Sequence, residues 1–164
     1  MTATSESPHL PAVGVADRRE IGLQLDATLV ELVDLSLLGN QLHWSVTGPR
    51  FLRLHQSLEQ QVACWRDLAD AVAERAVAIG YWPDAQAEVI ACGAEHTAVT
   101  RGPIEDQAVV QLLVETLSEL ASRTRSRLAR VGELDPVSHN LMIAVLGELE
   151  KQLWMSRAQL TLGD

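Results

Sequence analysis

The sequence predicts an all-α fold, a bundle of four long helices with one short extra helix. Apolar residues make up 47% of the 164 residues but aromatic residues only 4%, so the core must be built from aliphatic side chains, as in packed helices. In four long stretches these side chains recur every three or four residues, which is the spacing of one helix face. No stretch alternates apolar and polar residues over a length that would indicate a strand.

The first predicted helix spans residues 17–44. Asp17 and Glu20 have the spacing of a capping box, in which two side chains bond the free backbone amides at a helix start. The small residue Gly39 lies on the apolar face, which indicates that a neighbouring helix packs closely there. The pair Gly48-Pro49 ends the pattern because proline cannot continue the helical hydrogen bonding.

The second predicted helix spans residues 51–79. It ends before Gly80, which has the place of a left-handed glycine at a helix C-terminus. A long connection, 80–103, follows. Within this connection Asp84 is placed to cap a short helix that would run through Ile90.

The third and fourth predicted helices span 104–131 and 136–160. Gly132 ends the third, and Asp135-Pro136 supplies the N-cap and the first residue of the fourth. A short turn makes each helix pair antiparallel, while the long middle connection lets the second and third helices run parallel. This order of connections describes a ferritin-like four-helix bundle.

We expect one bundle domain over 17–161, after a flexible polar arm (1–16) and before a short C-terminal end (162–164). The arm lacks the charged start and apolar run of a signal peptide, and no run of 18 apolar residues is present to span a membrane. Cys64 and Cys92 lack metal-site spacing, so we expect reduced thiols in a cytoplasmic protein.

Five side chains form a candidate metal site. They are His43, His55, Glu59, Asp70 and Glu74. His55 and Glu59 are four residues apart, as are Asp70 and Glu74, so each pair shares a helix face. Carboxylates with a few imidazoles suit iron, manganese or zinc. The alternative is an ordinary solvated face, with Glu74 paired to an arginine such as Arg75.

The spacing adds a condition to this candidate site. His55 and Asp70 are 15 residues apart, which corresponds to about 22 Å along a straight helix. Side chains that far apart cannot bind the same ion. If the site is real, an antiparallel second copy must bring its Asp70 and Glu74 to the other three residues, and two-fold symmetry then creates two identical sites per dimer.

The residues around these positions resemble the Dps family, the mini-ferritins. The run His43-Trp44-Ser45-Val46-Thr47-Gly48-Pro49-Arg50-Phe51-Leu52-Arg53-Leu54-His55 is similar to the family pattern HWxVxGxxFxxLHxxxD. A downstream DxxAE is matched by Asp70-Ala71-Val72-Ala73-Glu74, and Glu150-Lys151-Gln152-Leu153-Trp154 is similar to the last-helix pattern of the family. The resemblance covers about residues 17–160.

The resemblance implies a ferroxidase that oxidises ferrous iron with hydrogen peroxide or dioxygen. Such proteins store the ferric product in a dodecameric shell built from two-fold dimers. It also implies that His43 and His55 bind iron from one chain and that Asp70 and Glu74 bind it from the partner chain. Zinc is a candidate competitor, and the sequence does not decide whether it competes. Trp44 follows the family's tryptophan beside the site, either as an acceptor of oxidising equivalents or as a packing aromatic. Glu59 stands where the family usually has Asp, which alters the spacing at the second iron position.

Iron would enter such a shell through acidic pores. Candidates on or beside the fourth helix are Glu133, Asp135, Asn140, Glu148 and Glu150. Asn140 stands where many relatives have an acid, which argues against a standard acidic pore, and ordinary surface charge is the more common role of such acids. No Glu-x-x-His motif occurs in the four predicted helices, which disfavours the intrachain di-iron site of larger ferritins.

Two other functions remain open. Many relatives compact the nucleoid by binding DNA, but DNA-binding proteins contact phosphates through Lys and Arg. This chain has a net charge of −9, a single lysine and no basic tail, so we expect weak DNA binding or none. The third hypothesis is a structural bundle whose metal site is vestigial and which oxidises no iron.

Overall fold

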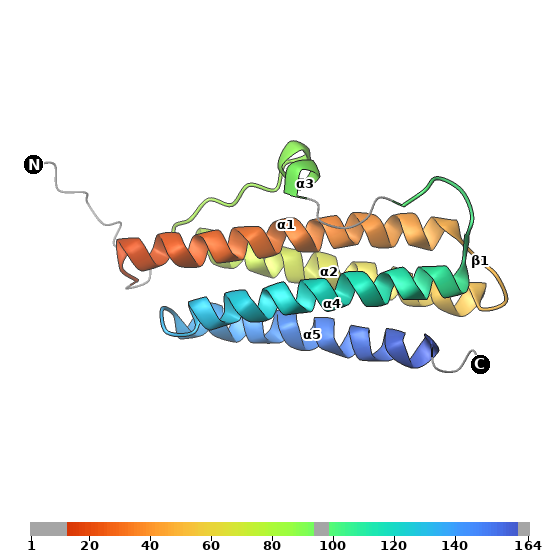
Figure 1. Ribbon diagram of the computed structural model, residues 1–164. Helices are drawn as coiled ribbons and strands as arrows, with labels where there is room; N and C mark the ends of the chain where they lie inside the picture. The colour runs from red at the N-terminus through yellow and green to blue at the C-terminus, as the bar shows by residue number, and fades with distance from the viewer. Residues whose placement is uncertain (1–12, 94–98, 161–164) are drawn as a thin grey trace, which may run out of the picture.

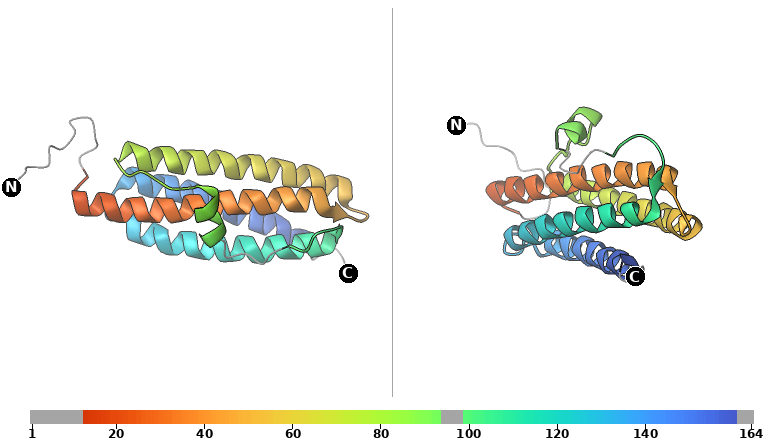
Figure 2. Two further views of the ribbon diagram at one scale, coloured as in Figure 1. Left: turned by 90° about the horizontal axis from the view of Figure 1, so that it is seen from above. Right: turned by 45° about the vertical axis from the view of Figure 1, so that its right-hand side comes forward.

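The structure is a computed structural model that describes residues 13–93 and 99–160. This part of the chain contains the four predicted long helices and the short one (Figure 1). They are α1 (Val15–Ser45), α2 (Phe51–Ala78), α3 (Ala87–Gly93), α4 (Asp106–Val131) and α5 (Pro136–Leu160). The hairpin of α1 and α2 packs beside the hairpin of α4 and α5, and the short α3 lies outside α1 (Figures 1 and 2). The predicted all-α bundle is confirmed.

The predicted helix end at Gly80 is confirmed in detail. Gly80 has φ +82°, a left-handed conformation that glycine adopts without strain. Its N–H donates to the Val77 carbonyl, and the Tyr81 N–H donates to the Ala76 carbonyl, both at 2.9 Å. These two bonds form a Schellman motif, which satisfies carbonyls that the end of α2 would otherwise leave free.

The predicted start of the fourth helix is also confirmed, whereas the start of the first is wrong. The Asp135 carboxylate accepts the Ser138 N–H at 2.7 Å, as an N-cap does. By contrast, α1 begins at Val15, with Gly14 at the cap and no side-chain hydrogen bond. Asp17 lies inside the first turn, where the positive end of the helix dipole favours its charge without a capping bond.

The short helix begins two residues later than predicted. Asp84 does not cap it, because its carboxylate accepts the Gln86 N–H at 3.1 Å in a local turn. Its own N–H donates to Asp26 of α1 at 2.8 Å. The helix α3 therefore starts at Ala87 and buries Ile90.

A two-residue parallel pairing at one end of the bundle was not predicted. It joins β1 (Val46–Thr47) to β2 (Ile104–Glu105). Next to it, Arg50 donates from its backbone N–H and from Nη2 to the two carboxylate oxygens of Asp106, at 2.7 and 2.8 Å. These contacts tie the start of α4 to the turn between α1 and α2.

The core is aliphatic, as predicted, with one large aromatic at its centre. Trp65 is fully buried and lies against Gly39, where an added Cβ would come within 2.5 Å of the indole ring. The predicted close approach at Gly39 is thus confirmed. The indole N–H donates to Gln152 of α5 at 2.6 Å. Trp65 therefore holds α2 against both α1 and α5.

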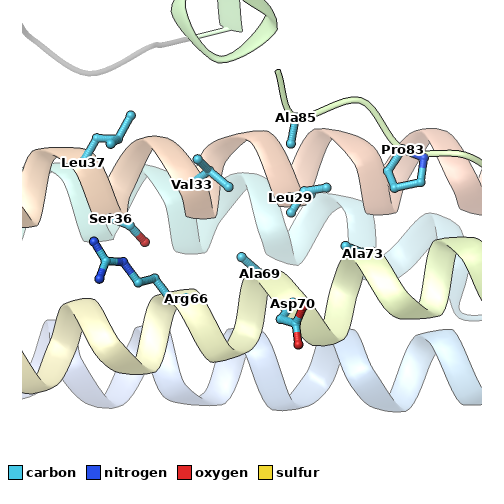
Figure 3. A pocket seen from close by; sticks show the side chains of 10 residues that line it. All are labelled: Leu29, Val33, Ser36, Leu37, Arg66, Ala69, Asp70, Ala73, Pro83 and Ala85. Carbon is cyan, nitrogen blue, oxygen red and sulfur yellow. The ribbon is translucent and has the colours of Figure 1, made fainter. Parts of the chain in front are cut away.

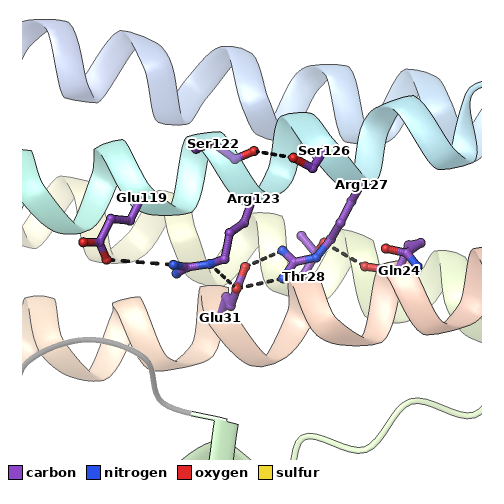
Figure 4. Close-up of polar contacts among 8 residues, drawn as sticks. All are labelled: Gln24, Thr28, Glu31, Glu119, Ser122, Arg123, Ser126 and Arg127. Carbon is purple, nitrogen blue, oxygen red and sulfur yellow. Dashed lines mark hydrogen bonds and ion pairs between the residues drawn. The ribbon is translucent and has the colours of Figure 1, made fainter.

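A buried carboxylate joins the two hairpins. Glu31 of α1 accepts hydrogen bonds from Arg123 at 2.6 Å and from Arg127 at 2.7 Å, and a second oxygen of Glu31 also contacts Arg127 (Figure 4). Two guanidinium groups compensate for the removal of this carboxylate from water. Among the described residues, none of the helices is long and apolar enough to cross a membrane.

Candidate metal centre

The structure brings His43 and His55 into direct contact. Their rings stack with centroids 3.7 Å apart at an angle of 22°. Each Nδ1 lies 3.0 Å from the backbone oxygen of the other histidine. Because a carbonyl oxygen only accepts hydrogen bonds, each Nδ1 carries a proton, and Nε2 of each ring is the nitrogen left to bind a metal ion. Metal-binding histidines are commonly oriented in this way, with the other ring nitrogen bonded to a carbonyl.

Local sequence explains how the two rings meet. His43 lies in the last turn of α1 and His55 in the second turn of α2, on either side of the tight turn that contains Gly48. Gly48 has φ +115°, and a Cβ there would lie 2.8 Å from the Asp106 carboxylate. The glycine thus permits the close turn that places the two histidines side by side.

Trp44 and Glu59 lie in the same region as the histidine pair. His43 and both of these residues line an open pocket of about 250 Å³ between α1 and α2. Glu59 is one turn beyond His55 and is exposed. Trp44 is 72% exposed, so it is not a core aromatic of the single chain. Both side chains are free to meet a ligand or a second molecule at this end of the bundle.

Asp70 and Glu74 do not reach the histidines. Asp70 lines a second pocket, of about 420 Å³, further along the groove between α1 and α2 (Figure 3). Glu74 lies one turn beyond it and is exposed. Within the described residues of one chain, no three His, Cys, Asp or Glu side chains are grouped closely enough to hold a metal ion. This agrees with the spacing argument that one chain cannot bring all five residues together.

The alternative pairing of Glu74 with Arg75 does not occur. Arg75 donates to Asp135 at 2.7 Å and to the Ser138 hydroxyl at 2.9 Å. Its guanidinium therefore points into the bundle, toward the start of α5. Glu74 forms no ion pair within the described part of the chain.

Arg66 was missed at the sequence level. It lines both pockets and therefore lies between the two groups of candidate ligands. Helical spacing could have identified it, because it is seven residues after Glu59 and four before Asp70, on the same face of α2. It adds a positive charge to a groove that otherwise carries carboxylates.

Two of the candidate pore acids form hydrogen bonds within the chain. Asp135 is buried and caps α5, so it is not a free pore carboxylate. Burial alone would raise the pKa of its carboxyl, but the hydrogen bonds from Ser138 and Arg75 hold that pKa below its usual value. Glu148 accepts from Lys151 and from Gln152, at 3.1 and 3.0 Å.

Comparison with known proteins identifies the kind of domain that the chain contains. The family model of the ferritin-like domain matches residues 23–164. The chain is 32% identical over 149 residues to DNA protection during starvation protein 2 of Deinococcus radiodurans. That alignment covers 91% of this chain and 62% of the relative, so the chain spans less than two thirds of that protein.

Solved structures agree with the fold and its connections. A tetragonal form of the Dps of Mycobacterium smegmatis has a TM-score of 0.88 at 30% identity, over 94% of each chain. The Dps of Microbacterium arborescens in its high iron form has a TM-score of 0.87 at 26% identity, over 93% of this chain and 99% of that one. The predicted ferritin-like topology, with its extra helix in the long connection, is confirmed.

Proposed function

Because the chain belongs to the Dps family of ferritin-like proteins, we propose that it oxidises ferrous iron and stores the ferric product inside an oligomeric shell. Each oxidation site would use His43, His55 and Glu59 of one chain with Asp70 and Glu74 of a two-fold related copy. Trp44 would lie beside the reacting iron. The structure of one relative in a high iron form supports iron as the substrate.

The arrangement of the histidine pair carries this proposal. Both Nδ1 atoms are held by backbone carbonyls, which leaves both Nε2 atoms available as ligands. Neutral imidazole retains ferrous iron, while the carboxylates stabilise the harder ferric ion.

The chemistry balances with two ferrous ions for each peroxide. Each ferrous ion gives up one electron, the O–O bond breaks, and two protons convert the two oxygen atoms to water. Taking both electrons in one encounter avoids release of a hydroxyl radical. The ferric ions then hydrolyse and form oxyhydroxide in the shell. Residues that hold two irons close together therefore protect the cell from both reactants.

The first experiment removes the histidine pair. In the variant His43→Ala/His55→Ala, we expect ferrous oxidation with peroxide, followed by ferric absorbance, to slow by at least about a hundredfold. The variant His139→Ala is the matched control, because this histidine lies on α5 away from the groove. Circular dichroism checks that both variants are folded. Oxidation at the wild-type rate in the double variant would disprove the site.

The second experiment tests whether two chains share each site. Chains with His43→Ala/His55→Ala are co-expressed in equal amounts with chains that carry Asp70→Asn/Glu74→Gln. Each variant alone has only defective sites, whereas a mixed dimer has one complete site. Random pairing should therefore restore about a quarter of the sites. A site within one chain predicts no restoration.

We further propose that the protein binds DNA weakly or not at all, although its relatives are named for DNA protection. Twelve copies at −9 each would carry roughly a hundred negative charges, which repel a phosphate backbone. A gel shift in moderate salt should show free DNA. Retarded DNA under those conditions would contradict this part of the proposal.

A further inference from the structure

Arg66 is a positively charged side chain that shares its pockets with the candidate metal ligands. It lines the pocket of about 250 Å³ together with His43 and Glu59, and it also lines the larger pocket that contains Asp70. It is exposed, and the described structure gives it no ion pair within the chain. A guanidinium without an ionic partner therefore lies between the two halves of the proposed site.

The neighbouring acids of α2 do not neutralise Arg66. Asp70 is four residues further on, but a basic residue that precedes its acidic partner is the weaker of the two orientations on a helix. In Figure 3 the Arg66 side chain extends away from Asp70, toward the part of α1 that carries Ser36. Glu59 is seven residues earlier and also has no ion pair among the described residues. Both carboxylates stay available to cations, and the positive charge of Arg66 stays in the groove.

The proposed shared site has a simple charge balance. Each site would contain three carboxylates, Glu59 from one chain with Asp70 and Glu74 from the other. A dimer has two such sites and two Arg66 side chains, so each site has one guanidinium. With the histidines neutral, three negative charges and one positive charge leave −2, which one divalent cation neutralises. A second cation would enter a site that no longer carries a net negative charge.

Arg66 is close enough to Glu59 for its charge to act on a bound cation. Both residues line the same pocket, and seven residues of helix correspond to about 10 Å. This separation is close to the screening length of roughly 8 to 10 Å at physiological ionic strength. A guanidinium keeps its charge at physiological pH. The repulsion therefore persists in solution and acts on the cation that Glu59 holds.

We propose that Arg66 limits the resting site to one tightly bound divalent cation by weakening the position beside Glu59. This rests on the proposed function, whose five ligands it uses. The second ferrous ion then stays only for the encounter with peroxide. A ferric ion carries one more positive charge than the ferrous ion it came from, so the same guanidinium favours its release into the shell. Arg66 acts through its charge and binds no metal itself.

Binding of ferrous iron without any oxidant tests this separately from the oxidation. Anaerobic titration calorimetry of the assembled wild-type protein should give one tight ferrous ion per chain and a second that binds at least about tenfold more weakly. In Arg66→Gln the second ion should bind about tenfold more tightly than in wild type. Arg66→Lys should behave as wild type, because it keeps the positive charge.

Arg130→Gln is the matched control for the change in net charge. It removes an exposed arginine on α4 that lines neither of the two pockets. Because charges further apart than the screening length interact little, both binding constants should change by less than about twofold.

Repeated turnover tests the effect on the ferric product. When ferrous iron and peroxide are added several times, Arg66→Gln should oxidise the first addition at least as fast as wild type. Later additions should be oxidised about tenfold more slowly, because ferric ions that leave the site slowly block it. A purely structural role of Arg66 predicts the same slowing in the first addition and in later ones.

The binding data distinguish failure of this inference from failure of the proposed function. Unchanged constants in Arg66→Gln, with binding that His43→Ala/His55→Ala abolishes, would overturn the role of Arg66 and leave the shared site standing. Loss of assembly in Arg66→Gln without tighter iron binding would make Arg66 an interface contact and would also overturn it. If wild type binds no ferrous iron at these ligands, the proposed function fails and this inference fails with it.

Discussion

The helices α4 and α5 differ from the groove between α1 and α2 in how their charged side chains are satisfied. Around α4 and α5, most charged groups are paired within the chain. These pairs are Arg75–Asp135, Arg125–Glu150, Lys151–Glu148 and Glu31 with Arg123 and Arg127. In the groove, the described structure gives Glu59, Arg66, Asp70 and Glu74 no ion pair within the chain. The charged groups around α4 and α5 thus have ion-pair partners within the chain, whereas these four groups of the α1–α2 groove have none in the described structure.

This difference separates residues that hold the fold from residues kept for a ligand or a second copy. A charge that is paired and buried stabilises only while its partner is present, because an uncompensated buried charge is costly. An exposed, unpaired charge costs the chain little and can bind metal. Variants around α4 and α5 should therefore change stability, and variants in the groove should change activity or assembly.

The largest effect on stability should come from Glu31→Gln. Arg123 and Arg127 would then lose the buried carboxylate that they share, and we expect a loss of about 3 kcal/mol in urea unfolding at fixed protein concentration. Glu119→Gln is the matched control, because this exposed carboxylate contacts Arg123 only at 3.9 Å and should cost under about 0.5 kcal/mol. Equal losses in the two variants would mean that burial of Glu31 has no special role.

A single carboxylate of the groove should show the opposite behaviour. Asp70→Asn should slow ferrous oxidation about a hundredfold, equivalent to about 2.7 kcal/mol, while the unfolding midpoint of the chain stays unchanged. Asp67→Asn replaces an exposed acid one turn earlier on α2 that lines neither pocket. If both variants lose activity equally, the groove acts through general negative charge rather than through ligands.

The Arg50–Asp106 pair should give an intermediate effect that depends on pH. Hydrogen bonds from Arg50 lower the pKa of the Asp106 carboxyl, so the folded state favours the charged form. The stabilisation is complete above the ordinary Asp pKa of about 3.9 and is lost as pH falls through the lower folded value. Arg50 is 35% exposed, so solvent screening limits the cost of Asp106→Asn to about 1 kcal/mol at pH 7. In urea titrations, the difference from wild type should shrink below pH 4; a constant difference would contradict this account.

The smallest effect should come from the exposed pair of Arg125 and Glu150. Both side chains are largely in water, where ion pairs contribute little. Arg125→Ala should change the unfolding free energy by less than about 0.5 kcal/mol and leave iron oxidation unaltered. A loss above about 1 kcal/mol would show that pairing alone, without burial, stabilises this bundle.

The helix ends show which parts of the fold the sequence could predict. Gly80 and Asp135 each determine their own local backbone, and both predictions were correct. Asp17 and Asp84 have the same chemistry as true caps, but neither caps a helix. The N–H of Asp84 bonds to Asp26 of another helix, and such a long-range contact leaves no local pattern.

The candidate site shows a similar limit. The spacing of His55 and Asp70 on one helix predicted their separation, since helix geometry is regular. The stacking of His43 on His55 depends on how two helices meet at a turn, which spacing does not reveal. Asp135 was taken for a possible pore acid because its burial cannot be read from charge patterns. The ligands themselves and the domain bounds stay predictions.

The reciprocal bonds of the histidine pair also have a consequence for how this protein can change over time. His55 bonds the carbonyl of His43, which lies in the last turn of α1, where carbonyls lack partners inside the helix. The His55 ring that presents Nε2 as a ligand therefore also satisfies a backbone carbonyl at the C-terminus of α1. Replacing either histidine should both weaken iron binding and loosen the turn, so selection for a stable bundle alone would tend to preserve them. A lineage that no longer needed iron oxidation would lose Asp70 and Glu74 first and its histidines last.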